Sequence, residues 1–370
     1  MSSDEDLGGA SWELGLGARM RRHYERFPYP KYSLLGSIRS RDAYIFSLEA
    51  LWAHFRGRRI RDPRAERVLL AGAGSFLPYP VCVANPRSRV VALDLSASSL
   101  ARARLHALRH LRFNLQCVAG DLMDPALAPG PYKYIDSFGV LHCIPDFSAA
   151  LAALRDRLDE GGILRVMVYS RDGRAQVEEV RSRCAERGIT RPAEVRRLAR
   201  GDPELRSLMR ESFELGFDEG IADAFLIPYA RTFVVDEVLE ALAETGLELL
   251  GFGHEGALAD PRRELARIRK LEAKREFPTN LCFYAGRPME APKPPAWIEL
   301  NPLLRNAVRF TPLGSVRLPT KFGPKNPPID AEARRFLSRF VRPVAAASLS
   351  SSERAQARAW ARLLVLMEYE

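Results

Sequence analysis

Small and acidic residues follow three short apolar runs, in an order that suits binding of a nucleoside. Gly72-Ala73-Gly74 follows the apolar run 68–71, and glycines at such a place let the backbone turn tightly and approach a ligand. Asp94 ends the next run, where a carboxylate can accept hydrogen bonds from the hydroxyls of a ribose. Asp121 follows a third run, where a carboxylate could accept an adenine amino proton.

A nicotinamide dinucleotide is one candidate for such a site. It requires a third glycine where the pyrophosphate meets a helix N-terminus. Leu77 stands at that position, Pro78 follows it, and nothing later in the chain suggests a nicotinamide site. The sequence therefore disfavours a dinucleotide.

The fourth apolar run ends at Gly139, which would let the backbone lie close to a ligand. His142 follows within the same turn and is the only histidine of this region at the end of a strand. We therefore consider His142 a general base. The alternative is that it packs against, or caps, the following helix.

These residues need a sheet to bring them together. Apolar runs at 68–71, 89–94, 115–118, 134–138 and 163–169 alternate with segments of helical composition. This alternation predicts an α/β fold with a parallel sheet covered by helices on both faces. Residues 247–252 and 281–285 add a sixth and a seventh strand, while 236–244 and 261–277 read as helices.

Outside the sheet, we expect residues 1–17 to be frayed, and Ser40 to cap a helix that stops at Gly57. Residues 172–223 read as charged helices. Prolines recur from 288 to 328, which predicts little regular structure, and two helices follow at 330–340 and 352–369. The predicted segments are a helical cap or lid (1–60), a cofactor core (61–172), a helical substrate-side insertion (173–235), the rest of the sheet (236–287) and a Pro-rich basic C-terminal extension (288–370).

At this point the chain resembles class I S-adenosylmethionine-dependent methyltransferases. Five segments carry the resemblance, in order and at the family's spacing. They are 69–75 (Leu-Leu-Ala-Gly-Ala-Gly-Ser), 91–96 (Val-Ala-Leu-Asp-Leu-Ser), 120–122 (Gly-Asp-Leu), 134–142 (Tyr-Ile-Asp-Ser-Phe-Gly-Val-Leu-His) and 158–164 (Leu-Asp-Glu-Gly-Gly-Ile-Leu). The resemblance implies a Rossmann-like sheet of seven strands.

A narrower resemblance links residues 22–30, with their Phe-Pro-Tyr-Pro ending, to a bacterial subgroup, some of whose members carry tetratricopeptide repeats. This chain has no such repeats. It departs from the family where Leu70 replaces the usual acid of the first motif and Phe76 its third glycine. The subgroup often lacks that acid, so the change does not imply loss of cofactor binding.

The resemblance implies S-adenosylmethionine as cofactor. The loop Gly72, Ala73 and Gly74 would pass beneath its methionine and ribose, and Asp94 would bind the ribose, with Leu95 against the adenine. Asp121 and Leu122 would also contact the adenine, and Gly139 would lie near the sulfonium.

Four residues are candidates for contact with the methyl acceptor. Tyr24 and Tyr29 belong to an aromatic N-terminal segment that could close over the cofactor as a lid, or simply pack on the domain. Tyr169 and Arg231 follow elements that end at the same sheet edge. Arg231 could bind a carboxylate or form a surface ion pair.

The function that the resemblance implies is methyl transfer to a nitrogen, oxygen or carbon atom of a small metabolite or natural product. Methyl transfer needs no covalent nucleophile, and the sequence offers no triad and no metal cluster. A protein or peptide methyltransferase is the first alternative. A catalytically silent S-adenosylmethionine-binding module is the second, and an RNA methyltransferase the third.

Composition limits the remaining classes. Of the 370 residues, 46% are hydrophobic and 28% charged, with a net charge of +10, as expected of a globular chain. No apolar run is long enough to span a membrane, and no signal peptide is evident, so we expect a cytoplasmic protein without a membrane partner. Five scattered cysteines argue against disulfides. The basic stretch 262–270 contains glutamates and reads as a solvated helix, so nucleic acid is not favoured. The C-terminal extension could wrap the domain or join a homodimer.

Overall fold

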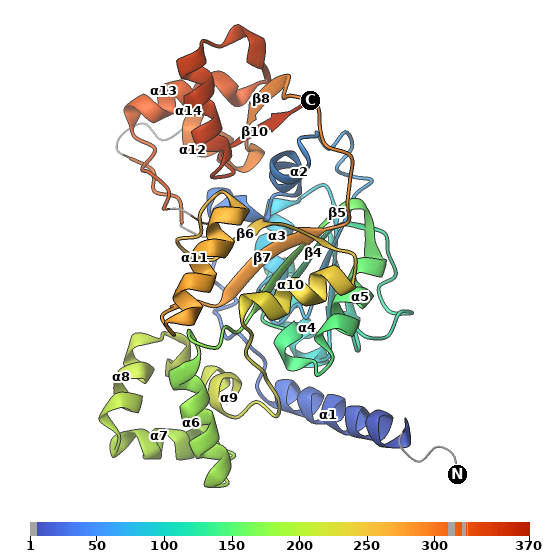
Figure 1. Ribbon diagram of the computed structural model, residues 1–370, viewed down its shortest axis with the longest axis vertical. Coiled ribbons are helices and arrows are strands. Elements are labelled where there is room, and N and C mark those ends of the chain that lie inside the picture. The colour runs from blue at the N-terminus through green and yellow to red at the C-terminus, as the bar shows by residue number, and fades with distance from the viewer. Residues whose placement is uncertain (1–5, 310–314, 320–322, 324) are drawn as a thin grey trace.

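A seven-stranded sheet with helices on both faces forms the centre of the molecule (Figure 1). The computed structural model describes residues 6–309, 315–319, 323 and 325–370. The strands are β1 Arg67–Ala71, β2 Arg89–Asp94, β3 Leu115–Ala119, β4 Tyr132–Phe138, β5 Leu158–Val168, β6 Glu248–Phe252 and β7 Leu281–Gly286. Their order is β3-β2-β1-β4-β5-β7-β6, and only β7 runs antiparallel to its neighbours. This confirms the predicted Rossmann-like α/β class.

The central strands are apolar on both sides because both faces of the sheet are covered. Val68 and Leu70 of β1 belong to one core, and Leu69 and Ala71 belong to the other. The first core includes α3 Pro78–Ala84 and α2 Leu48–Arg56, with α4 Ala97–Arg109 beside α3. The second includes α5 Phe147–Arg157, α10 Val235–Glu244 and α11 Pro261–Ala273. After each parallel strand, the connecting segment returns the chain to the opposite edge of the sheet. The carboxyl ends of all the parallel strands therefore lie at one edge.

The N-terminal segment corrects two of our expectations. Residues 6–17, expected to be frayed, are part of the helix α1 Asp6–Arg26, while residues 1–5 lie outside the described residues. Leu16 and Met20 are buried against Ile227 and Ala230. This tertiary burial orders a glycine-rich sequence that would not form a stable helix alone.

The second correction concerns the helix expected to begin at Ser40. Ser40–Phe46 is a short 3-10 helix, and α2 begins afterwards, with Ser47 as its N-cap. Gly57 ends α2 in the left-handed conformation, with φ of 59°, as predicted.

Residues between β5 and α10 form a helical unit with a small core of its own. It consists of α6 Ala175–Glu186, α7 Pro192–Arg200, α8 Pro203–Glu211, a 3-10 turn Glu214–Gly216 and α9 Asp218–Phe225. This agrees with the helical composition of the predicted insertion. In Figure 1, the unit lies at the lower end of the molecule, with α9 beside α1.

The C-terminal residues form a second, three-stranded sheet, which our sequence analysis did not predict. It has the order β10-β8-β9, from β8 Trp297–Leu300, β9 Val344–Ala345 and β10 Leu366–Tyr369, with α12 Arg305–Arg309, α13 Ala331–Ser338 and α14 Ser351–Ala361 around it. The helix expected over 352–369 therefore ends at Ala361. Over so short an apolar run, periodicity does not separate helix from strand.

This unit packs on the sheet domain through α2. Ala50 and Ala53 of α2 are buried against Met367 and Tyr369. The extension thus packs against one part of the sheet domain, and a homodimer through it stays a prediction. Within the described part of the chain, no helix is both long and apolar enough to cross a bilayer.

Candidate active site

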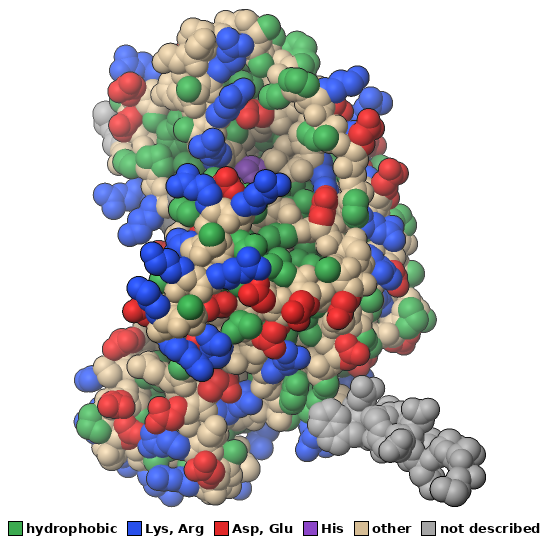
Figure 2. Space-filling view, viewed as in Figure 1, with side chains coloured by type: hydrophobic (Ala, Val, Ile, Leu, Met, Phe, Trp, Pro, Cys, Tyr) green, Lys and Arg blue, Asp and Glu red, His purple; other side chains and the backbone are tan. Residues whose placement is uncertain are grey.

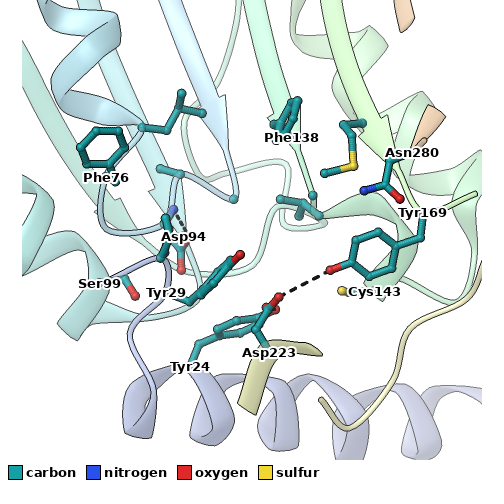
Figure 3. Close-up of a pocket in the computed structure, with 18 of the residues that line it drawn as sticks. Tyr24, Tyr29, Phe76, Asp94, Ser99, Phe138, Cys143, Tyr169, Asp223 and Asn280 are labelled. Atoms are coloured by element: carbon teal, nitrogen blue, oxygen red, sulfur yellow. Dashed lines mark hydrogen bonds between the residues drawn. The ribbon is translucent and has the colours of Figure 1, made fainter. Parts of the chain in front are cut away.

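A cavity of about 1530 Å³ lies at the carboxyl edge of the large sheet. Its walls come from the loops after β1, β2, β3 and β4, from the end of β5, and from α1 and α9. Figure 3 shows part of this lining, with Asp94 on one side of the cavity and Tyr169 on the other. Because single-ligand pockets measure roughly 300–1,000 Å³, the cavity has room for a cofactor and a second molecule.

The glycine loop after β1 adopts a backbone that only glycine tolerates well. Gly72 and Gly74 have φ of 75° and 59°. A Cβ on Gly72 would overlap the side chain of Val140, and one on Gly74 would lie 2.9 Å from the carbonyl oxygen of Tyr29. The glycine loop therefore lies in close contact with the residues after β4 on one side and with the N-terminal segment on the other, and it lines the cavity.

Asp94 at the end of β2 holds the glycine loop in place. Its Oδ2 accepts a hydrogen bond from the Gly74 N–H at 2.8 Å, and its Oδ1 accepts one from Ser96, also at 2.8 Å. Burial raises the pKa of this carboxyl above its usual value, and the two N–H donors oppose that shift. Each oxygen keeps a further lone pair, so Asp94 can still receive ribose hydroxyls from the cavity side.

All eight residues predicted to bind the cofactor line this one cavity. They are Gly72, Ala73, Gly74, Asp94, Leu95, Asp121, Leu122 and Gly139. Gly139 has φ of 79°, and a Cβ there would meet only Met167 Cε at 3.5 Å, so its backbone borders open space. The residues thus fit a ligand with adenine, ribose and methionine groups, and their individual roles stay predictions.

The cavity also contains Asp223 on α9, a buried acid that our sequence analysis missed. Tyr24 Oη donates to Asp223 Oδ1 at 2.9 Å, and Tyr169 Oη donates to Oδ2 at 3.5 Å (Figure 3). The side chain is 8% exposed, and burial raises its pKa to about 6. A signal was present in the sequence, because Asp223 is the only charged residue in the apolar stretch 220–227.

A second acid, Glu214, accepts a hydrogen bond from Tyr29 Oη at 2.6 Å. Tyr24, Tyr29 and Tyr169 all line the cavity, and their contact with an acceptor stays a prediction. Burial and the neighbouring carboxylates raise the pKa of each phenol, so the phenols remain protonated donors. The backbone of Tyr29 also receives a hydrogen bond from the N–H of Ser75, which places the N-terminal segment directly over the glycine loop.

Two predicted residues do not reach this cavity. His142 is 1% exposed, lies against the ring of Tyr169 at 3.6 Å between centroids, and is not among the lining residues. Burial lowers its pKa to about 3, and neither ring nitrogen has a hydrogen-bond partner among the described residues. This geometry favours the packing alternative over a general base.

Arg231 also lies outside the cavity. Its guanidinium pairs with Glu237 at 2.9 Å and lies over the ring of Phe233. This is the surface ion pair that we considered as the alternative, formed because α10 begins only four residues after Arg231. Three other arginines line the cavity, namely Arg21, Arg165 and Arg174, and the last of them directly precedes α6. Among the described residues, no cluster of three His, Cys, Asp or Glu side chains could hold a metal.

The fold and the cavity agree with the class I methyltransferases that the sequence resembles. The family model for a methyltransferase domain matches residues 69–164, which span β1 to β5 and contain most of the cofactor-side lining. This chain therefore carries an S-adenosylmethionine-dependent methyltransferase domain, as the resemblance implied. The narrower resemblance of residues 22–30 stays a prediction.

Similarity to individual proteins is more distant. An uncharacterized protein of Synechococcus sp. is 28% identical over 295 residues, which cover 71% of this chain and 70% of that protein. Two structures of PKMT2 from Rickettsia typhi, one in complex with AdoHcy, share the fold with TM-scores of 0.53 and 0.52 at 16% and 14% identity. The matches cover 70% and 93% of this chain, and 55% and 77% of those chains.

Proposed function

We propose that this methyltransferase transfers the methyl group of S-adenosylmethionine to an amine nitrogen of a small molecule, and that Asp223 binds this amine. The single observation that carries the proposal is a buried carboxylate, held by two phenols, on the wall of the cavity opposite the glycine loop. The sequence left nitrogen, oxygen and carbon atoms open as methyl acceptors, and the proposal selects nitrogen.

The electrostatics of the acceptor side favour a cation. No Lys, Arg or His among the described residues forms an ion pair with Asp223, and the nearby charge of Arg174 lowers the pKa of this buried carboxyl only in part against the effect of burial. Buried charges are costly unless paired, and a ligand ammonium would supply the partner. Glu214 adds a second carboxylate, and the rings of Tyr24 and Tyr29 add aromatic surface of the kind that attracts cations.

The chain's own residues would position the amine, take its proton and keep water out. When bound, S-adenosylmethionine supplies a methyl group already activated by the positive sulfur. Asp223 would hold the nitrogen in line with the glycine-loop side of the cavity and accept a proton that the amine loses. The helix α1 and the segment after it, fastened by Tyr24 and Tyr29, would exclude solvent from this space.

A small acceptor is favoured over a protein because α1 and α9 both contribute to the walls of the cavity and their side chains are joined across it. A polypeptide acceptor would have to enter past these contacts. Robust labelling of a protein band from radioactive S-adenosylmethionine, without labelling of small molecules, would favour the protein alternative.

We also propose a cytoplasmic location, with which the five free cysteines agree.

The test is Asp223→Asn, measured as S-adenosylhomocysteine formation with a panel of small amines. We expect kcat to fall about a hundredfold or more, because the amide carries no charge and accepts no proton. Asp218→Asn is the matched control, since Asp218 lies on the same helix but pairs with Arg196 at the surface. Tight cofactor binding without turnover on any amine would instead favour the silent binding module.

A further inference from the structure

The acceptor side of the cavity holds a cation that the proposed function does not use. Arg174 lines the cavity, and its guanidinium carbon lies 3.6 Å from the centre of the Tyr169 ring. Among the described residues, none forms an ion pair with Arg174, and its Nε is buried without a hydrogen-bond partner. An arginine that lines a cavity without an acceptor can bind an anionic group there.

The guanidinium is held in position by stacking. His142 also stacks on Tyr169, with 3.6 Å between ring centroids and an interplanar angle of 25°. Two groups at this distance cannot share one face of a ring, so His142 and Arg174 cover opposite faces of Tyr169. The stack fixes the arginine before any ligand arrives, which lowers the entropic cost of binding.

Asn280 provides a second donor beside this stack. Val168 of β5 pairs with Leu281 of β7, so the antiparallel register places Asn280 opposite Tyr169. The carbonyl oxygen of the Asn280 side chain is buried without a partner, and Figure 3 shows the amide nitrogen directed into the cavity. Arg174 and Asn280 thus both offer N–H donors to the same cavity, close to Tyr169.

From this arrangement we infer that Arg174, with Asn280, binds a carboxylate of the methyl acceptor, so the acceptor is a zwitterion that carries an amine and a carboxylate. The inference rests on the proposed function, since Asp223 must bind the amine. Asp223 and Arg174 line the same cavity, and the charge of Arg174 lowers the pKa of Asp223. A ligand with both charges would satisfy both side chains at once.

The cofactor's own carboxylate is the competing anion. Asp94, which marks the predicted ribose position, and Tyr169, which carries Arg174, lie on opposite sides of the cavity in Figure 3. This separation places Arg174 away from the predicted ribose position, and we assign it to the acceptor rather than to the methionine end of the cofactor. A direct measurement of cofactor affinity distinguishes the two assignments.

The experiment uses matched amines with and without a carboxylate, namely L-lysine with 1,5-diaminopentane, L-tyrosine with tyramine, and L-histidine with histamine. Initial rates of S-adenosylhomocysteine formation give kcat/KM for each. We expect the intact chain to prefer the carboxylate-bearing member of at least one pair by about tenfold or more. Arg174→Gln should abolish that preference, by lowering kcat/KM for the carboxylate-bearing member about tenfold or more. Arg187→Gln, on an exposed residue at the end of the same helix, is the control.

Three results would overturn the inference. Equal rates within every pair would show that the acceptor needs no carboxylate, and would leave the proposal of an amine acceptor intact. A loss of S-adenosylhomocysteine affinity in Arg174→Gln, measured by calorimetry, would assign the arginine to the cofactor. No methylation of any amine, with the cofactor bound, would refute the proposed function itself. If Arg174→Gln does not fold, Arg174→Lys keeps the charge without the planar fork and should reduce the preference only in part.

Discussion

The phenol of Tyr29 donates a 2.6 Å hydrogen bond to Glu214, which lies 185 residues later in the chain. A second bond joins Tyr24 to Asp223, and Lys31 pairs with Glu219 at 2.7 Å. Three contacts thus join the N-terminal segment to the insertion after β5, and both segments line the cavity. The acceptor side therefore depends on two parts of the chain that flank the methyltransferase domain.

Loss of one fastening bond should weaken the enclosure without removing the site. We expect Tyr29→Phe to raise KM for the acceptor several-fold and to change kcat less, because the ring is retained while one hydrogen bond to a charged acid, worth roughly 1.5–3 kcal/mol, is lost. Steady-state kinetics measures both constants. Tyr32→Phe is the control, since the Tyr32 ring stacks on Phe76 and its hydroxyl is not part of the three contacts. Equal KM in both variants would argue against a lid.

Cofactor affinity should depend on Asp94. Asp94→Ala removes the carboxylate that binds Gly74 and Ser96 and, as predicted, the ribose, so we expect S-adenosylmethionine binding to fall by about tenfold or more. Isothermal titration calorimetry measures this loss. Asp156→Ala, an exposed residue paired only with its neighbour Arg155, serves as the control. Unchanged affinity of Asp94→Ala would exclude the assignment.

The pH dependence of kcat/KM should distinguish Asp223 from His142 as the group whose ionisation controls activity. Asp223, with a pKa of about 6, must be ionised to attract an ammonium, so kcat/KM should fall as the pH drops below about 6. His142, with a pKa of about 3, is neutral over this range. We expect His142→Phe to keep both the stack on Tyr169 and the limb near pH 6. A limb that disappears in His142→Phe but not in Asp223→Asn would restore the histidine as base.

In its ionised form, Asp223 should also lower the free energy of unfolding of the protein. Its pKa is raised on folding from 3.8 to about 6, so the folded state binds the proton more tightly than the unfolded state. The stability that this proton contributes is fully present below pH 3.8 and is lost as the pH rises through about 6. We therefore expect Asp223→Asn to be inactive yet more resistant to heat than the parent at pH 8, with a smaller difference at pH 5. Thermal unfolding at both pH values tests this, and a lower melting temperature of the variant at pH 8 would contradict it.

Two glycines at positive φ, one in the glycine loop and one outside it, allow a matched pair of alanine substitutions. Gly72→Ala and Gly246→Ala both place a Cβ at positive φ, of 75° and 67°. Only the first meets an obstacle, because the Cβ would overlap Val140, whereas nothing lies within 4 Å at Gly246. We expect Gly246→Ala to lose roughly 1–2 kcal/mol of unfolding free energy and Gly72→Ala to lose more. Urea denaturation measures the difference, and equal losses would show that Val140 moves aside.

The sheet and its cofactor side were predictable because each carries a local signal. The apolar runs that became β1 and β2 are bounded by Gly72 and Asp94, so the chemistry and the strand end coincide in the sequence. The acceptor side was not, because its acids lie on helices far from those motifs. Arg231 was chosen for its place after a helix, but the local pair with Glu237 determines its position. The strand β10 was missed because its partner β8 lies about 65 residues earlier, and long-range pairing has no local signature.

The contact between Tyr24 and Asp223 also sets an order of events during synthesis. The helix α1 leaves the ribosome first, but its buried residues Leu16 and Met20 pack against Ile227 and Ala230. Until that later stretch has been translated, α1 can contact α4 but lacks the partners of Leu16 and Met20, and the cavity has no wall from α9. A nascent chain that already holds all five methyltransferase motifs would thus be unable to enclose an acceptor, and competence to methylate would arrive only as the insertion folds back onto the first helix.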